Sequence, residues 1–78
     1  MPTVLRAGPY RLYFFSGDRT EPPHVHVGRD SCMAKFWLAP VRCAWSRGFN
    51  PAETRRISAM IVLHETQLKD AWREYFGT

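Results

Sequence analysis

Two histidines separated by one residue form the part of this sequence that is best suited to chemistry. His24 and His26 alternate with valines directly after a pair of prolines. Proline favours an extended chain before it, and alternation of polar and apolar residues with a period of two is typical of a β-strand. Both imidazoles are therefore expected on one face of a strand, with Val25 and Val27 on the other. Histidine exchanges protons near neutral pH and also binds metals, so the segment predicts a functional site.

Three roles remain open for this histidine pair. The imidazoles can belong to a solvated strand face or a structural hydrogen-bond network, or they can act on a substrate or contact nucleic acid. They can also bind a metal, but two ligands at positions i and i+2 need a third and usually a fourth. Asp18 and Glu21 are near in sequence, in a turn-rich loop whose direction the sequence does not define. We therefore expect no metal site and no cofactor.

The elements that position the histidines follow from residue patterning. β-prone runs bounded by glycine and proline predict three strands, at residues 10–16, 24–27 and 32–38. Residues 3–7 are expected as a short first strand or an arm, and residues 41–46 as a short fourth strand or an irregular segment. Residues 1–48 therefore predict a small antiparallel sheet of three or four strands.

The C-terminal third predicts one long helix over residues 50–76. Asn50 is a suitable N-cap, Pro51 suits the first helical position and Glu53 the third. A single apolar stripe then recurs at helical spacing. Its members are Ile57, Ile61, His64, Leu68, Trp72 and Tyr75, widened by Phe76. His64 is expected as a core histidine, and Gly77 supplies a stop. The 78 residues thus predict one α+β domain, with the sheet packed on one face by a single C-terminal helix.

Alternation assigns two faces to the predicted sheet. The apolar face, expected beneath the helix, consists of Leu12, Phe14, Val25, Val27, Ala34, Phe36 and Leu38. The mixed face, expected to be open to water, consists of Arg11, Tyr13, Phe15, His24, His26, Met33, Lys35 and Trp37. Aromatic rings among basic groups can stack bases and hold phosphates. Alternatively, the aromatic residues form a second small core, covered by the N-terminal arm, by residues 41–46 or by a second subunit.

The charge of the chain favours nucleic acid as a partner. The net charge is +4, and the excess lies in residues 1–50, where seven basic residues face three acidic ones. Nine of the eleven basic residues are arginine, which suits phosphate and base stacking, although ordinary surface charge explains the excess equally well. No apolar stretch is long enough to span a bilayer and no signal segment is evident, so a cytoplasmic location is expected. Cys32 and Cys43 are expected to be buried free thiols.

Four features of the chain together resemble a known family. They are Tyr10-Arg11-Leu12-Tyr13-Phe14-Phe15-Ser16, Pro22-Pro23-His24-Val25-His26-Val27, Ala34-Lys35-Phe36 and the spaced residues His64, Leu68 and Trp72. They are similar to the bacterial family catalogued as domain of unknown function 4160, over nearly the whole chain. The family pattern emphasises the positions of His24, His26 and Lys35. The resemblance implies a small bacterial or archaeal protein of a kind often suspected to be the toxin of a toxin–antitoxin pair, with an antitoxin-like partner.

RNA binding is the leading functional interpretation, with metal-independent ribonuclease activity as its extension. His24 and His26 would then act as base and acid, and Lys35 or Arg11 would stabilise the phosphate. The bases would stack on Tyr13, Phe15 and Trp37. One alternative is a non-catalytic interaction module whose mixed face binds an acidic protein or a second copy of the chain. Another is a metal-dependent binder or hydrolase that uses the histidine pair.

Overall fold

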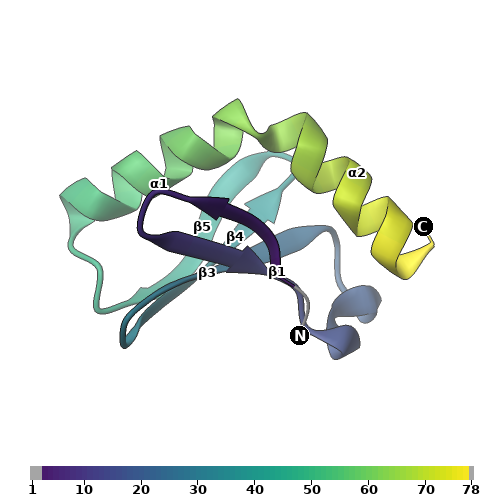
Figure 1. Cartoon of the computed structure of the whole chain (residues 1–78), viewed down its shortest axis with the longest axis horizontal. Helices are drawn as coiled ribbons and strands as arrows, with labels where there is room; N and C mark the ends of the chain where they lie inside the picture. Colours follow the sequence, from purple (N-terminus) through teal and green to yellow (C-terminus); the bar gives the residue numbers. More distant parts are fainter. Residues whose placement is uncertain (1–2, 78) are drawn as a thin grey trace.

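The computed structural model describes residues 3–77, which form a five-stranded antiparallel sheet with two helices across one face (Figure 1). Strands that are consecutive in the sequence are neighbours in the sheet, so the order is β1-β2-β3-β4-β5. The elements are β1 (Thr3–Ala7), β2 (Tyr10–Tyr13), the 3-10 helix η1 (Ser16–Thr20), β3 (His24–Arg29), β4 (Cys32–Leu38), β5 (Val41–Arg47), α1 (Pro51–Leu63) and α2 (Glu65–Phe76). The predicted α+β class is confirmed. None of the helices in this part of the chain has the length and apolar character needed to cross a membrane.

The sheet has more strands than the three or four predicted from the sequence. Both segments that patterning left open are strands, because β1 pairs with β2 and β5 pairs with β4. The register of β4 and β5 shifts between Lys35 and Phe36, where Cys43 rather than Ala44 lies opposite Phe36. An extra residue of this kind disrupts the period-two alternation that identifies a strand in a sequence. The bulge therefore explains why residues 41–46 were difficult to assign.

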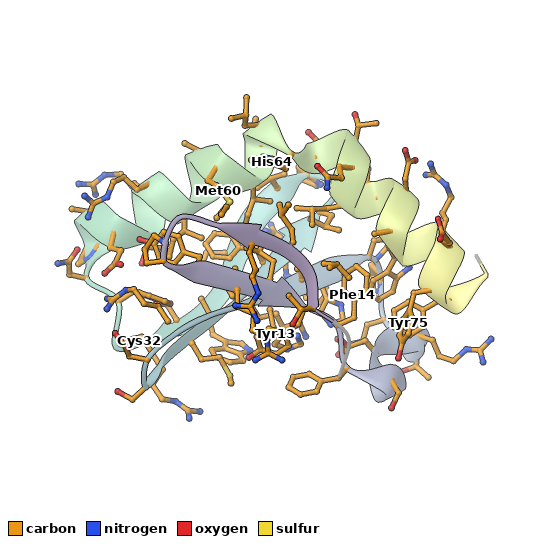
Figure 2. All side chains as sticks on the ribbon, in the orientation of Figure 1. Tyr13, Phe14, Cys32, Met60, His64 and Tyr75 are labelled. Carbon is orange, nitrogen blue, oxygen red and sulfur yellow. The ribbon has the colours of Figure 1, made fainter. Side chains whose placement is uncertain are left out.

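The single long helix predicted for residues 50–76 is two helices that meet at His64. The backbone of His64 leaves the helical region, with φ −106° and ψ 18°. Its ring nitrogen Nδ1 donates to the carbonyl oxygen of Met60 at 2.9 Å, and Figure 2 shows these residues at the bend. Local side-chain bonds of this kind compete with the helical hydrogen-bond ladder. His64 is half-buried. The bend lets α1 contact β5 while α2 contacts β1 and β4.

The core between the helices and the sheet is apolar throughout. Every residue predicted on the apolar face of the sheet is buried there. The helices contribute Ile57, Ile61, Leu68, Trp72 and Phe76, and Phe49 joins them from the preceding loop. Tyr75, which was expected in the same stripe, is 43% exposed. Its neighbour Phe76 is the residue that is buried, with its ring centroid 5.8 Å from that of Phe14.

Glu53 ties the start of α1 to the sheet. Its backbone N–H donates to the Asn50 side chain at 2.8 Å, which confirms the predicted N-cap. Its carboxylate accepts two hydrogen bonds from the guanidinium group of Arg29, each at 2.9 Å, and one from the Tyr10 hydroxyl at 2.7 Å. The bonds from Arg29, and then from Tyr10, hold the pKa of Glu53 below its ordinary value. One carboxylate thus joins β2, β3 and α1.

The stability that Glu53 contributes is expected to disappear in acid. Because its folded pKa lies below the ordinary value of 4.5, the bonds contribute fully above that value and are lost as the pH falls through the folded pKa. Thermal unfolding of the wild type and of Glu53→Gln, from about pH 7 to about pH 3, measures this. The wild type should melt higher at neutral pH, and the two melting temperatures should converge in acid. A difference that does not change with pH would contradict the assignment.

Candidate functional site

A layer of aromatic rings and imidazoles fills the middle of the sheet face opposite the helices. His24 is fully buried, His26 is 6% exposed and Tyr13 is 3% exposed. The ring of His26 stacks on Tyr13 at a centroid distance of 5.6 Å and meets Phe15 edge-on at 4.5 Å. The expectation that these side chains are open to water is therefore wrong. The loop between β2 and β3, which contains η1, places Asp18 against both imidazoles.

His24 has a defined orientation at the start of β3. Its Nδ1 lies 3.0 Å from the carbonyl oxygen of Pro22. A carbonyl oxygen can only accept, so Nδ1 carries the proton that is donated. The other ring nitrogen, Nε2, lies 3.1 Å from Asp18 Oδ2 and 3.6 Å from Glu21 Oε1. Because His24 is the first residue of β3, its ring also meets Trp72 of α2, at a centroid distance of 5.2 Å.

Asp18 completes a cluster with the two histidines. We call Asp18, His24 and His26 the Asp-His-His cluster; their facing nitrogen and oxygen atoms all lie within 4.8 Å of one another. Asp18 Oδ2 is 3.7 Å from His26 Nδ1 and accepts a hydrogen bond from the backbone N–H of Phe15 at 2.9 Å. Burial lowers the pKa of His26, an effect that Asp18 partly opposes. Sequence reasoning noted Asp18 near the histidines but did not assign it to the site; the signal present was an acidic residue three positions after Phe15, where it can cap the turn.

Lys35 lies beside the cluster and is held by Glu21. His26 of β3 pairs directly with Lys35 of β4. Lys35 Nζ donates to Glu21 Oε1 at 2.7 Å and lies 4.6 Å from the centre of the Trp37 ring. The hydrogen bond from Lys35 holds the pKa of Glu21 below its ordinary value. The three residues predicted to be catalytic are therefore neighbours, but two of them are enclosed.

Three arginines lie in one row across the same face of the sheet. Residues paired across neighbouring strands project to the same side, and the register pairs Arg6 with Arg11, Arg11 with Gly28, Gly28 with Met33, and Met33 with Arg47. We call Arg6, Arg11, Gly28, Met33 and Arg47 the basic row. The Arg11 guanidinium lies over the Tyr13 ring, 4.4 Å from its centre, and donates to Thr3 Oγ1 at 2.7 Å.

A cleft opens between the basic row and the aromatic layer. Its volume is about 420 Å³, and the side chains of Arg6, Arg11, Tyr13 and Phe15 line it. Three of the four residues predicted to bind nucleic acid therefore share one cleft. The fourth, Trp37, lies apart, with its ring 5.5 Å from that of His24. Trp37 lines a separate hollow of about 230 Å³ with prolines from two loops.

Comparison with known proteins places these features in a family. The family model for Domain of unknown function (DUF4160) matches residues 10–73 of the chain. No match was found among curated proteins or among solved structures. The matched range contains the Asp-His-His cluster, Glu21, Lys35 and four members of the basic row. Because the match covers most of the chain, this protein belongs to the family of Domain of unknown function (DUF4160).

Proposed function

We propose that this protein binds single-stranded RNA along the basic row and in the cleft beside it. The observation that carries the proposal is the direct pairing of Arg6 with Arg11 across β1 and β2. Like charges directly opposite one another destabilise a sheet. A phosphate group between them would remove the repulsion, and arginine suits phosphate in both shape and charge. Among residues 3–77 the arginines that form salt bridges are Arg29 and Arg73, so the charges of the basic row are available to a ligand, although the carboxylate of Asp30 also lines the cleft.

The cleft beside the row suits a nucleotide base. Its volume of about 420 Å³ lies within the range of small-molecule sites. Phe15 is half-buried, so part of its ring is available for stacking a base. Tyr13 is only 3% exposed and stacks on His26, which gives it a supporting role rather than the stacking role expected from the sequence. Gly28 carries no side chain, and the Tyr13 ring packs over it, since an added Cβ would lie 3.5 Å from a carbon of that ring.

RNA cleavage and toxicity are separate parts of this proposal. His24 and His26 are buried, so RNA held in the cleft would reach them only after η1 moves away. The binding proposal therefore does not depend on cleavage. The resemblance to suspected toxins supports a setting in the bacterial cytoplasm with an acidic antitoxin-like partner, which would compete with RNA for the basic row. Growth of cells that express the protein, alone and together with a candidate acidic partner, tests this setting.

Titration of a labelled single-stranded RNA at several salt concentrations tests the binding. Each phosphate contact should contribute a slope of about −0.7 in a plot of log K against log salt, so three arginines predict about −2. Arg6→Gln and Arg11→Gln should each flatten the slope by about 0.7. Phe15→Ala should weaken binding by about 1–3 kcal/mol without changing the slope, because stacking releases no counterions.

Arg55→Gln is the matched control for these variants. Arg55 is exposed on α1, which covers the opposite face of the sheet, so this variant removes an equal charge away from the cleft. Its RNA affinity and salt slope should equal those of the wild type. Failure of the wild type to bind RNA at low salt, or equal weakening by Arg55→Gln and Arg11→Gln, would reject a specific role for the basic row.

The edge strand β5 favours a second candidate function, that of a protein-interaction module. β5 is the last strand of the sheet, and Trp45 on it is 38% exposed. Arg47 lies 5.8 Å from the centre of the Trp45 ring. An exposed edge strand with an aromatic side chain can pair with another chain. Sedimentation of the wild type and of Trp45→Ala distinguishes the candidates: an interaction module would associate through β5 without binding RNA.

A further inference from the structure

We propose that the Asp-His-His cluster is a binding site for one divalent transition-metal ion, with zinc as the best fit. The site goes beyond the RNA-binding proposal and uses none of the residues of the basic row. The ligand atoms would be Asp18 Oδ2, His24 Nε2 and His26 Nδ1, which face one another in the cluster. The sequence predicted no metal site because only two ligands were evident in it. The structure supplies a third from η1.

The protonation of His24 is the first argument. Nδ1 donates to the Pro22 carbonyl, so in the neutral ring Nε2 carries a lone pair. This lone pair lies 3.1 Å from a carboxylate oxygen of Asp18, which can also only accept. Two acceptors at this distance repel each other, and a cation between them would remove the repulsion. A proton on Nε2 would also remove it, by forming an ion pair with Asp18, but His26 Nδ1, at 3.7 Å from the same oxygen, would still have no hydrogen-bond partner among residues 3–77.

The burial of both nitrogens is the second argument. His24 Nε2 and His26 Nδ1 are buried and have no hydrogen-bond partner within the described part of the chain. A buried polar atom without a partner is costly, and such atoms are uncommon in folded proteins. The side chains are 0% and 7% exposed, and both nitrogens face the same carboxylate. One ion bound between them would satisfy both nitrogens together.

Two of the three distances between ligand atoms fit a small ion, and the third lies within 4.8 Å. Zinc bonds to nitrogen and oxygen are about 2.0–2.2 Å long, so neighbouring ligands in a tetrahedral site lie roughly 3.4 Å apart. The distances from Asp18 Oδ2 to the two nitrogens are 3.1 and 3.7 Å, on either side of this value. Two imidazoles and one carboxylate are a ligand set that zinc and its neighbours prefer over magnesium or calcium.

The surroundings orient the ligands as metal sites commonly require. A ligating histidine usually donates its second N–H to a carbonyl or carboxylate, as His24 does to Pro22. The backbone N–H of Phe15 holds Asp18, and the rings of Tyr13 and Phe15 hold His26.

Glu21 lies between the cluster and solvent. Glu21 Oε1 lies 3.6 Å from His24 Nε2 and its side chain is 45% exposed. A fourth ligand, either water or this carboxylate, and the ion itself would therefore arrive from the side of Glu21 and Lys35. Three protein ligands with one open position are typical of zinc sites that act on a substrate.

Thermal unfolding of the chelator-treated wild-type protein with zinc, cobalt, magnesium or calcium chloride tests the proposal. An ion that binds only the folded state raises the melting temperature. At a zinc concentration 100-fold above Kd, the rise should be roughly 10–20 °C for a domain of this size. Zinc and cobalt should stabilise the protein with one ion per chain by calorimetric titration. Magnesium and calcium should have little effect.

Substitutions within and outside the cluster identify the ligands. Asp18→Asn keeps an oxygen for the Phe15 cap but removes the charge, and should weaken zinc binding at least about 10-fold. His26→Gln should do the same. His64→Gln, which changes the histidine outside the cluster, should leave zinc binding unchanged. Cys32→Ser and Cys43→Ser should also leave it unchanged, and the cobalt spectrum should lack thiolate charge-transfer bands.

The wild-type titration decides the proposal even if a cluster variant fails to fold. Absence of any zinc-dependent rise in melting temperature in the wild type would overturn it. It would also be overturned if zinc stabilised Asp18→Asn and His26→Gln as strongly as the wild type, because the ion would then bind elsewhere. RNA binding by Arg6→Gln and Arg11→Gln is measured independently, so either proposal can fail without the other.

Discussion

Replacing Trp72 with alanine is expected to lower the free energy of unfolding by about 3–5 kcal/mol, the usual range for a buried large aromatic residue. Trp72 is 3% exposed in the middle of α2. Its ring centroid lies 4.2 Å from that of Phe76, 5.3 Å from that of Phe14 and 5.2 Å from that of His24. It therefore fastens α2 to the core and also supports one histidine of the Asp-His-His cluster. Since the total free energy of unfolding of a small domain is only about 5–15 kcal/mol, this variant approaches complete unfolding.

Tyr75→Ala is the control for this substitution. Tyr75 lies in the same helix and also contacts Phe14, at a centroid distance of 6.0 Å, but it is 43% exposed. Tyr75→Ala should lower the free energy of unfolding much less than Trp72→Ala does, because less of the Tyr75 side chain leaves water on folding. Urea unfolding of the wild type and both variants measures the difference. A loss for Trp72→Ala below about 1 kcal/mol would show that the ring contributes as a surface residue does.

The parts of the fold that were predictable are those set by short-range periodicity. Alternating residues in β3 and β4 identified the buried face, and helical spacing identified Ile57, Ile61, Leu68 and Trp72. In both cases the burial of one face demands an apolar residue at a fixed interval, so the pattern is visible in the sequence itself. The N-cap at Asn50 was predictable for a similar reason, since its partner Glu53 is only three residues away.

The burial of His24 and His26 on the mixed face of the sheet was not predictable in this way. It depends on the path of the loop between β2 and β3, and a loop with few apolar residues has no period. Asp18 points at His24 and His26 because η1 turns back over the strands. The break at His64 was missed for a comparable reason. The apolar spacing continues through it, and a single side-chain bond to Met60 marks the position.

The basic row was found only in part. Arg11 was selected because it shares a strand with Tyr13, whereas Arg6 and Arg47 lie on strands that the sequence left uncertain. Their alignment with Arg11 follows from the pairing register of four successive hairpins. Register is set by the turns and by the bulge in β5, so charges on three of the five strands cannot be placed in one row from composition alone.

Replacing Gly48 with alanine is expected to lower the free energy of unfolding by about 2–6 kcal/mol, an effect comparable to that of Trp72→Ala, for two combined reasons. Gly48 has a φ of +91°, which side chains rarely adopt, and such strain costs about 1–3 kcal/mol. A Cβ atom there would also lie 2.7 Å from Cys32 Sγ and 3.3 Å from Cys32 Cα. Overpacking of this kind typically costs a further 1–3 kcal/mol or so, because the backbone of β4 cannot yield as a flexible side chain can.

Two other glycines separate strain from steric overlap. Gly8 has a φ of +59° but no atom within 4 Å of an added Cβ, so Gly8→Ala measures strain alone. Gly17 has neither feature, so Gly17→Ala should be close to neutral. Urea unfolding of the three variants should therefore give losses that increase from Gly17→Ala to Gly8→Ala to Gly48→Ala. If Gly48→Ala cost no more than Gly8→Ala, the junction between β5 and α1 would be able to shift away from Cys32. In that case Arg47, the neighbouring residue in the basic row, would not be held rigidly in its register with Met33.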